Sequence, residues 1–328
     1  MGNKYKLLPF IKEIIDKECP DTNSLIDIFS GTGAVSSAFN DKVIYTNDLL
    51  YSNYISNVAW FSPEKYDPDT IKKLITKYNS ISSSGENYMT ENFSDTFFCK
   101  DDCYKIGYIR EDIEKEFANG YINVRERALL ITSLLYAMDK IARTCGHYEA
   151  YRKGAKFDHH LELSLPLASN DNNPLNKCFN TDANKLAREI SADICFIDPP
   201  YNSRDYVSSY HLLENVAVWD KPEVFGVARK MDRTAKKSKY CSKEATNAFE
   251  DLINNLDTKY IVLTYNNMAQ KGNDRSNAKI SDEDILRILK NKGDVKVYSQ
   301  EYKAFSAGKT NIKDNEERVF VCKCYEKE

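Results

Sequence analysis

Four consecutive residues, Asp198, Pro199, Pro200 and Tyr201, combine side chains that could bind and activate an amino group. They directly follow the apolar segment DICFI (193–197), which predicts a buried strand. The two prolines lack backbone donors and fix φ, so a carboxylate, carbonyls outside regular pairing and an aromatic ring share one rigid turn. This turn suits a planar substrate whose amino group donates to the oxygens while its face stacks on the ring. Taken alone, the same residues also fit a turn that simply ends a strand.

A second group of residues surrounds a glycine-containing turn near the N-terminus. The segment SLIDIF (24–29) predicts a strand, Gly31 and Gly33 follow it, and Asp48 ends the next predicted strand (42–48). Glycines let the backbone approach a ligand closely, and a carboxylate after the second strand can bind ribose hydroxyls. The spacing is GxG and not GxGxxG, so a plain tight turn also explains it. Together with Asp48, however, the turn favours a nucleoside-type cofactor.

Positive charge is concentrated in one stretch of a chain whose net charge is −3 over 328 residues. Seven basic side chains lie between positions 229 and 243, and only Asp232 opposes them. Such a run can bind phosphates without sequence preference, although a solvated loop has the same composition. We expect phosphate contacts from Arg229, Lys230, Arg233, Lys236, Lys237 and Lys239.

The elements that must position these residues follow an α/β pattern. Short apolar segments predict strands at 24–29, 42–48, 193–197, 259–264, 294–299 and 318–324, with helical stretches at 5–18, 182–190, 242–256 and 281–291. We therefore predict one discontinuous sheet domain, formed by residues 1–50 and 179–328, with helices on both faces. Residues 51–178 form an insert, in which 51–120 look irregular and 122–143 strongly helical.

Composition excludes several classes of protein. Hydrophobic residues make up 42% and charged residues 29%, which is typical of a globular chain. No apolar stretch approaches the ~20 residues of a membrane helix, and no secretory leader is evident, so we predict a cytoplasmic protein. The nine cysteines follow no disulfide or zinc spacing, so we expect reduced thiols and no metal.

Together, these motifs resemble those of the adenine-specific DNA methyltransferases, which modify the N(6) amino group with S-adenosylmethionine. The closer resemblance is to the restriction–modification subgroup whose cofactor motif precedes its recognition insert. DPPY (198–201) resembles the catalytic motif, DIFSGTG (27–33) resembles the cofactor loop, and Gly2-Asn3-Lys4 resembles an N-terminal GxK segment.

The resemblance implies a Rossmann-like S-adenosylmethionine-dependent methyltransferase sheet with an inserted, mainly helical DNA-recognition subdomain. Its implied substrate is double-stranded DNA, with a cognate restriction endonuclease as a further partner but no stable complex. It implies catalytic roles for residues 198–201 and DNA contacts from the basic run, and also from Arg152 and Lys153, because GHYEAYRKG is similar to a DNA-contacting hairpin. The implied cofactor-binding residues are Lys4, Asp27, Phe29, Gly31, Gly33, Asp48 and Asp182.

The implied reaction is direct methyl transfer to an adenine that has left the duplex, with Tyr201 stacking on the base. Methyltransferases of RNA or of protein glutamine form an alternative, but they more often carry Asn in place of Asp198 and have little use for so long an insert. A catalytically silent nucleic-acid-binding protein is disfavoured by the intact motifs. A nicotinamide dehydrogenase is disfavoured because the third glycine of its fingerprint is missing.

Overall fold

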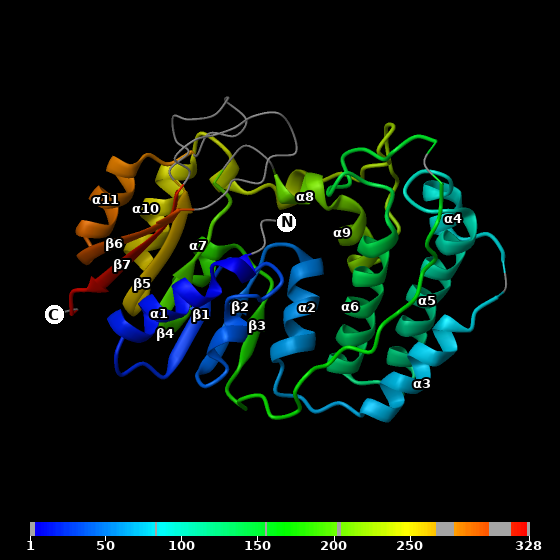
Figure 1. The fold of residues 1–328 in the computed structure, drawn as a ribbon, viewed down its shortest axis with the longest axis horizontal. Coiled ribbons are helices and arrows are strands. Elements are labelled where there is room, and N and C mark those ends of the chain that lie inside the picture. Colours follow the sequence, from blue (N-terminus) through cyan, green and yellow to red (C-terminus); the bar gives the residue numbers. More distant parts are fainter. Residues whose placement is uncertain are drawn as a thin grey trace. The chain divides into compact units, whose positions relative to one another are not determined.

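The chain divides into two compact units (Figure 1). The computed structural model describes residues 4–82, 84–154, 156–201, 205–266, 279–301 and 316–326. The first of the two units, called here the sheet unit, comprises Met1–Leu49, Leu175–Asp205 and Lys236–Glu328. The second, called here the helical unit, comprises Leu50–Pro174 and Tyr206–Ala235. The predicted split is therefore wrong for residues 206–235, which were assigned to the sheet domain but belong with the insert.

A seven-stranded sheet forms the centre of the sheet unit, in the order β3-β2-β1-β4-β5-β7-β6. The five strands from β3 to β5 are parallel, and β7 runs antiparallel to both β5 and β6. The chain order reverses between β1 and β4, and open α/β sheets bind ligands at such a switch point. The strands are β1 (Ser24–Asp27), β2 (Val43–Asn47), β3 (Lys177–Phe179), β4 (Ser191–Ile197), β5 (Asp257–Asn266), β6 (Gly293–Glu301) and β7 (Glu316–Cys324).

Helices cover both faces of this sheet, as predicted. On one face, Ile26 and Cys195 pack in a single core with α7 (Ala183–Leu186), α10 (Ala245–Asn255) and α11 (Asp282–Lys290). Side chains alternate between the faces of a strand, and Leu25 and Phe196, on the other face, are also fully buried. On that face, the carboxylate at the end of α1 (Leu8–Glu18) contacts Lys296 and Tyr298 of β6.

The described part of the sheet unit also contains short 3-10 helical turns. The turn η1 (Lys4–Lys6) precedes α1, and η2 (Ser36–Phe39) follows the glycine turn. A third short turn, η4 (Lys239–Cys241), lies within the basic run. The segment AVSSAFN (34–40) predicts a helix after the glycine turn, but the structure has a single 3-10 turn there.

Helices make up nearly all the regular structure of the helical unit. Residues 51–120, predicted to be irregular, contain four helices, and the predicted helix at 122–143 is confirmed. The missed helix α3 is amphipathic, with Ile71, Leu74 and Tyr78 buried along one side. The helices are α2 (Tyr51–Phe61), α3 (Pro68–Asn79), α4 (Tyr88–Phe93), α5 (Lys100–Ala118), α6 (Val124–Ile141), α8 (Tyr206–Ser209) and α9 (His211–Val218). A further turn, η3 (Thr234–Lys236), lies at the boundary of the units.

Two buried charges explain why residues 206–235 belong to the helical unit. The carboxylate of Glu214 on α9 accepts from the backbone N–H groups of Tyr51 and Ser52, at 2.9 and 2.8 Å, and so caps α2. The buried guanidinium of Arg110 on α5 donates to the carbonyls of Val216 and Ala217. Since a buried charge without partners is costly, α9 is essential to the core of this unit.

The nine cysteines are all free thiols, as expected from their spacing. In the part of the chain that the structure describes, no helix has both the length and the apolar character needed to cross a membrane.

Candidate active site

Asp198 lies at the carboxyl end of β4, beside the switch point of the sheet. The Thr264 hydroxyl on β5 donates to its Oδ1 at 2.8 Å, and the Lys4 ammonium lies 3.2 Å from the same oxygen. Lys4 also donates to Glu317 on β7 at 2.8 Å. Lys4, the first described residue, thus reaches the predicted catalytic turn. Gly2 and Asn3 of the GxK segment lie outside the described residues.

The rest of this turn is fixed by the sheet and by the residues that follow β5. Pro199 is buried, and the Tyr201 ring packs edge-on against the buried Tyr265, with 6.1 Å between ring centroids. The Tyr201 carbonyl accepts from the Lys279 backbone N–H at 2.9 Å. The aromatic ring, half-buried, is therefore positioned by its neighbours next to the carboxylate.

The glycine turn lies at the end of β1, the strand next to β4. Gly31 and Gly33 have φ values of +52° and +80°, a region that residues with a Cβ rarely adopt. The Gly31 N–H donates to Asp48 Oδ2 at 2.9 Å, so the carboxylate after β2 also shapes the turn. Half-buried Phe29 packs edge-on against Tyr240 at 5.0 Å. The two strand ends predicted to act together are therefore joined directly.

Asn47 connects three parts of this edge and was not singled out from the sequence. Its side-chain amide donates to the carbonyls of Ile28 and Thr181, and its Oδ1 accepts from the Thr181 N–H. Asp182, the residue after Thr181, caps α7 by accepting from the Lys185 N–H at 3.1 Å. Thus Asn47 holds the ends of β1 and β2 against the turn that carries Asp182.

Asp27 is a buried carboxylate whose charge the chain compensates only in part. Ser36 donates to its Oδ2 at 3.1 Å, whereas Oδ1 has no hydrogen-bond partner among the described residues. Burial raises the pKa of Asp27 to about 7; the Ser36 hydrogen bond opposes this rise, and Asp198 adds to it. A positively charged ligand group near Oδ1 would favour the ionised form.

These features match the needs of a nucleoside cofactor that carries positive charge, such as S-adenosylmethionine. A Cβ built at Gly31 would meet no atom within 4 Å, so there is open space beside the turn. Asp27 offers a buried carboxylate oxygen that no described residue bonds, and Asp48 offers a carboxylate at the end of β2. The residues present therefore fit the cofactor that the motifs imply.

The predicted DNA-binding residues are divided between the two units. Arg229, Lys230 and Arg233 belong to the helical unit, whereas Lys236, Lys237 and Lys239 belong to the sheet unit. The run that is continuous in the sequence therefore does not form one element. It begins in a short hairpin, where Phe225 and Lys230 pair in an antiparallel bridge.

Within the helical unit, some of these basic side chains already have partners. Lys230 lies 3.4 Å from the Glu149 carboxylate, and Arg233 donates to Ser208 and to the Met231 carbonyl. Arg152 and Lys153 are exposed beside an antiparallel bridge between residues 144 and 151, and Arg152 Nε also donates to Cys145 Sγ at 3.4 Å. Lys237 and Lys239 of the sheet unit are also exposed.

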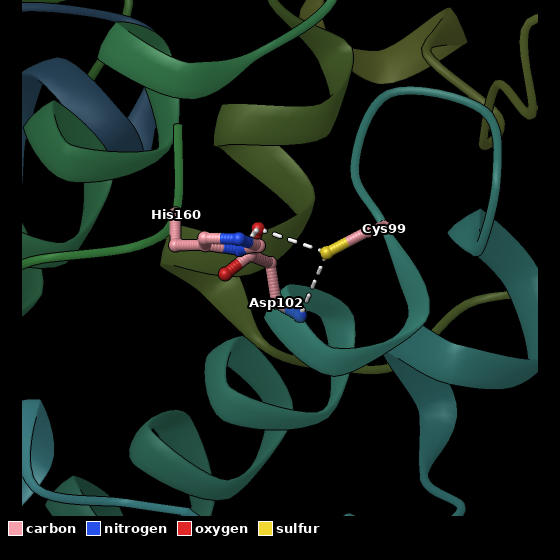
Figure 2. Close-up of side chains that lie close together, drawn as sticks. All are labelled: Cys99, Asp102 and His160. Carbon is pink, nitrogen blue, oxygen red and sulfur yellow. Dashed lines mark hydrogen bonds and ion pairs between the residues drawn. The ribbon is translucent and has the colours of Figure 1, made fainter. Parts of the chain in front are cut away.

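Figure 2 shows a cluster of Cys99, Asp102 and His160 in the helical unit that the spacing of cysteines and histidines did not reveal. The Cys99 thiol donates to Asp102 Oδ2 at 3.0 Å, and His160 Nδ1 lies 3.4 Å from that oxygen. Asp102 Oδ1 accepts from the Leu161 N–H. Burial raises the pKa of Cys99 to about 11, which keeps the thiol as a donor. The cluster thus joins residues 160–161 to the first turn of α5.

Comparison with known proteins places these features in one family. Residues 1–269 match the D12 class of N6 adenine-specific DNA methyltransferases. The chain is 32% identical to modification methylase LlaI of Lactococcus lactis subsp. lactis, over 95% of this chain and 52% of that protein. It is 34% identical to modification methylase StsI of Streptococcus sanguinis, over 88% of this chain and 46% of that one.

A third relative is similar in length to this chain. Type II methyltransferase M.NlaIII of Neisseria lactamica is 29% identical, over 96% of this chain and 94% of its own. The chain thus spans about half the length of LlaI and StsI but nearly all of M.NlaIII. The chain belongs to the D12 class of N6 adenine-specific DNA methyltransferases. The resemblance stated from the motifs is confirmed.

Proposed function

We propose that this chain transfers a methyl group from S-adenosylmethionine to the N(6) amino group of an adenine in double-stranded DNA, within a restriction–modification system. The observation that carries the proposal is the position of two predicted sites on neighbouring strands. The glycine turn and Asp27 follow β1, and Asp198 follows β4, at the switch point where α/β sheets bind ligands.

Asp198 and Pro199 would activate the adenine. The amino nitrogen is a poor nucleophile because its lone pair is delocalised into the ring. If its two N–H groups donate to the Asp198 carboxylate and the Pro199 carbonyl, the nitrogen moves toward tetrahedral geometry and the lone pair becomes localised. The turn thus supplies orientation and a preorganised negative charge. Tyr201 would stack on the base once it has left the duplex.

The cofactor, when bound, supplies a methyl group made electrophilic by the adjacent sulfonium. Asp27 would compensate its positive charge, Asp48 would bind ribose hydroxyls, and Gly31 would let the backbone approach it closely. Lys4, Phe29, Gly33 and Asp182 complete the proposed cofactor-binding set. The exposed cations at Arg152, Lys153, Lys237 and Lys239 would bind DNA phosphates.

The experiment that tests this proposal measures methyl transfer from labelled S-adenosylmethionine to unmethylated genomic DNA, followed by modification-sensitive sequencing. We expect label in N(6)-methyladenine at one short motif, and no label in DNA that already carries that modification. If the chain binds S-adenosylmethionine but labels only RNA or protein glutamine, the proposal that DNA is the substrate is wrong.

A further inference from the structure

We infer that Glu317 is a positioning residue for Asp198 and that it acts through Lys4. This inference deepens the function proposed above and rests on it. Lys4 Nζ lies between the two carboxylates, 2.8 Å from Glu317 Oε1 and 3.2 Å from Asp198 Oδ1. The family match ends at residue 269, so Glu317 lies on a strand beyond it.

The three charged groups are largely shielded from water. The side chains of Lys4, Glu317 and Asp198 are 14%, 12% and 23% exposed. Burial opposes the charge on Lys4, but the two adjacent carboxylates outweigh it, and the pKa of Lys4 lies well above its ordinary value. Lys4 therefore remains an ammonium group, bound on both sides, at any pH at which the enzyme is studied.

The sheet places Glu317 on the same face as Thr264, the residue whose hydroxyl contacts Asp198. In the antiparallel register of β5 and β7, Thr264 faces Val319 and Asn266 faces Glu317. Residues that face each other, and those two apart on one strand, project from the same side of a sheet. Thr264 reaches Asp198 directly, and Glu317 reaches it through Lys4.

Both described partners of Asp198 contact the same oxygen, Oδ1. This arrangement assigns Oδ2 to the substrate amino group. Glu317 holds the Lys4 ammonium on the Oδ1 side, where it cannot bridge both oxygens and compete with the amino group. Without Glu317, Lys4 has Asp198 as its only carboxylate partner among the described residues, and the oxygen needed by the substrate becomes a target for it.

The first test replaces Glu317 with glutamine, which keeps the shape of the side chain and removes its charge. We expect kcat to fall about ten- to a hundred-fold, as for a misplaced catalytic group, with KM for DNA changed less than two-fold. The exposed carboxylate of Glu189, in the same unit, provides the matched control variant Glu189→Gln, which should behave as the wild type. An unchanged kcat in Glu317→Gln overturns the inference.

A double-mutant cycle tests whether the effect passes through Lys4. If it does, Glu317→Gln should cause little further loss of kcat in a Lys4→Met background, because groups that act as a unit are not additive. Fully additive losses would mean that Glu317 acts independently, and the inference would be wrong. Thermal unfolding of all variants identifies any loss caused by misfolding.

A readout without catalysis separates this inference from the proposed function. Nitrogen-15 NMR of the Lys4 side chain in the full chain reports on the hydrogen bonds of its ammonium group while that group stays charged. Glu317→Gln should shift the Lys4 Nζ resonance and speed the exchange of its protons with water, because one of two adjacent carboxylates is lost. If the wild type fails to methylate DNA, the proposed function fails, whereas an unchanged Lys4 resonance in Glu317→Gln overturns the link between Lys4 and Glu317 alone.

Discussion

Asp198 and Asp27 follow neighbouring strands, but the protein treats their charges differently. Asp198 is in contact with an ammonium group and a hydroxyl donor. Asp27 is 1% exposed and has a single described hydroxyl donor, with one oxygen left unpartnered. The negative charge on Asp198 is thus stabilised by the chain itself, whereas Asp27 has no cationic side chain beside it among the described residues.

This difference teaches how two carboxylates can share one edge without sharing a role. A carboxylate with a built-in counter-ion can accept hydrogen bonds from a neutral amino group. A buried carboxylate without one is suited to a cationic ligand, because the ligand compensates a negative charge that is costly to bury alone. Of the four predictions below, given from the largest expected effect to the smallest, the first two test this comparison and the last two extend it to the neighbouring turn and to the DNA contacts.

Replacing Asp198 with alanine should abolish methyl transfer, with a loss of about a thousand-fold or more in the single-turnover rate. Binding of S-adenosylmethionine should remain within a few-fold of the wild type, because Asp27 and the glycine turn are untouched. Rapid-quench measurement of labelled DNA, together with calorimetric binding of the cofactor, checks both parts. Normal turnover in this variant would remove Asp198 from the proposed mechanism.

Replacing Asp27 with asparagine should weaken cofactor binding about ten- to a hundred-fold at pH 8, the range for a hydrogen bond to a charged group. The pKa of Asp27 is raised by burial to about 7, so its ionised form is disfavoured until the pH approaches that value. In the wild type, affinity should therefore rise with pH and level off above about 7, while the stability of the unliganded chain falls over the same window.

Asp27→Asn should remove both of these pH dependences. Asp41→Asn, which changes an exposed carboxylate of the sheet unit, provides the control. A pH profile of cofactor affinity that is identical in wild type and Asp27→Asn would show that Asp27 does not compensate the cofactor's charge.

Replacing Asp48 with alanine should raise the Kd for S-adenosylmethionine about ten-fold, the effect of losing one or two hydrogen bonds. The carboxylate also accepts from the Gly31 N–H, so the variant tests the shape of the turn together with the ribose contact. Asp48→Asn retains one acceptor for Gly31 and should lose less. Equal losses in both variants would mean that the charge of Asp48, and not the turn, determines binding.

Neutralising Lys237 and Lys239 should weaken DNA binding equally for all sequences and reduce the slope of log K against log salt by about 1 to 2. Both side chains are exposed in the sheet unit, whereas Lys230 already contacts Glu149. Lys230→Gln should therefore change the slope less. Titrations of a labelled duplex at several salt concentrations measure this difference. An unchanged slope in the double variant would mean that Lys237 and Lys239 lie in a solvated loop that does not bind DNA.

Much of the sheet unit could be predicted from local sequence, because its strands are short apolar segments and its site residues directly follow them. The full set of contacts made by Asp198 could not be predicted in this way. Thr264 stands near the end of a predicted strand, so its place at this edge could have been inferred. Glu317 depends on the antiparallel register of β7 with β5, and one sequence gives no signal for that register.

Four helices of the helical unit were missed in residues 51–120, although α3 has one buried apolar side, a pattern that predicts a helix. The capping signals were present as well: Asp67 caps α3, and Asn87 and Asn123 form capping boxes at α4 and α6. The assignment of residues 206–235 could not follow from local pattern. It depends on long-range contacts of Glu214 and Arg110, which join parts of the chain more than a hundred residues apart.

The interleaving of the two units constrains any effort to exchange the helical unit between relatives. The chain passes from one unit to the other four times, after residues 49, 174, 205 and 235. A chimaera that grafts only residues 50–174 would leave the acceptors of Arg110 and the cap of α2 to be supplied by a foreign α9. Recombination in the laboratory should therefore exchange 50–174 and 206–235 as a matched pair, and single-crossover libraries should yield few folded enzymes.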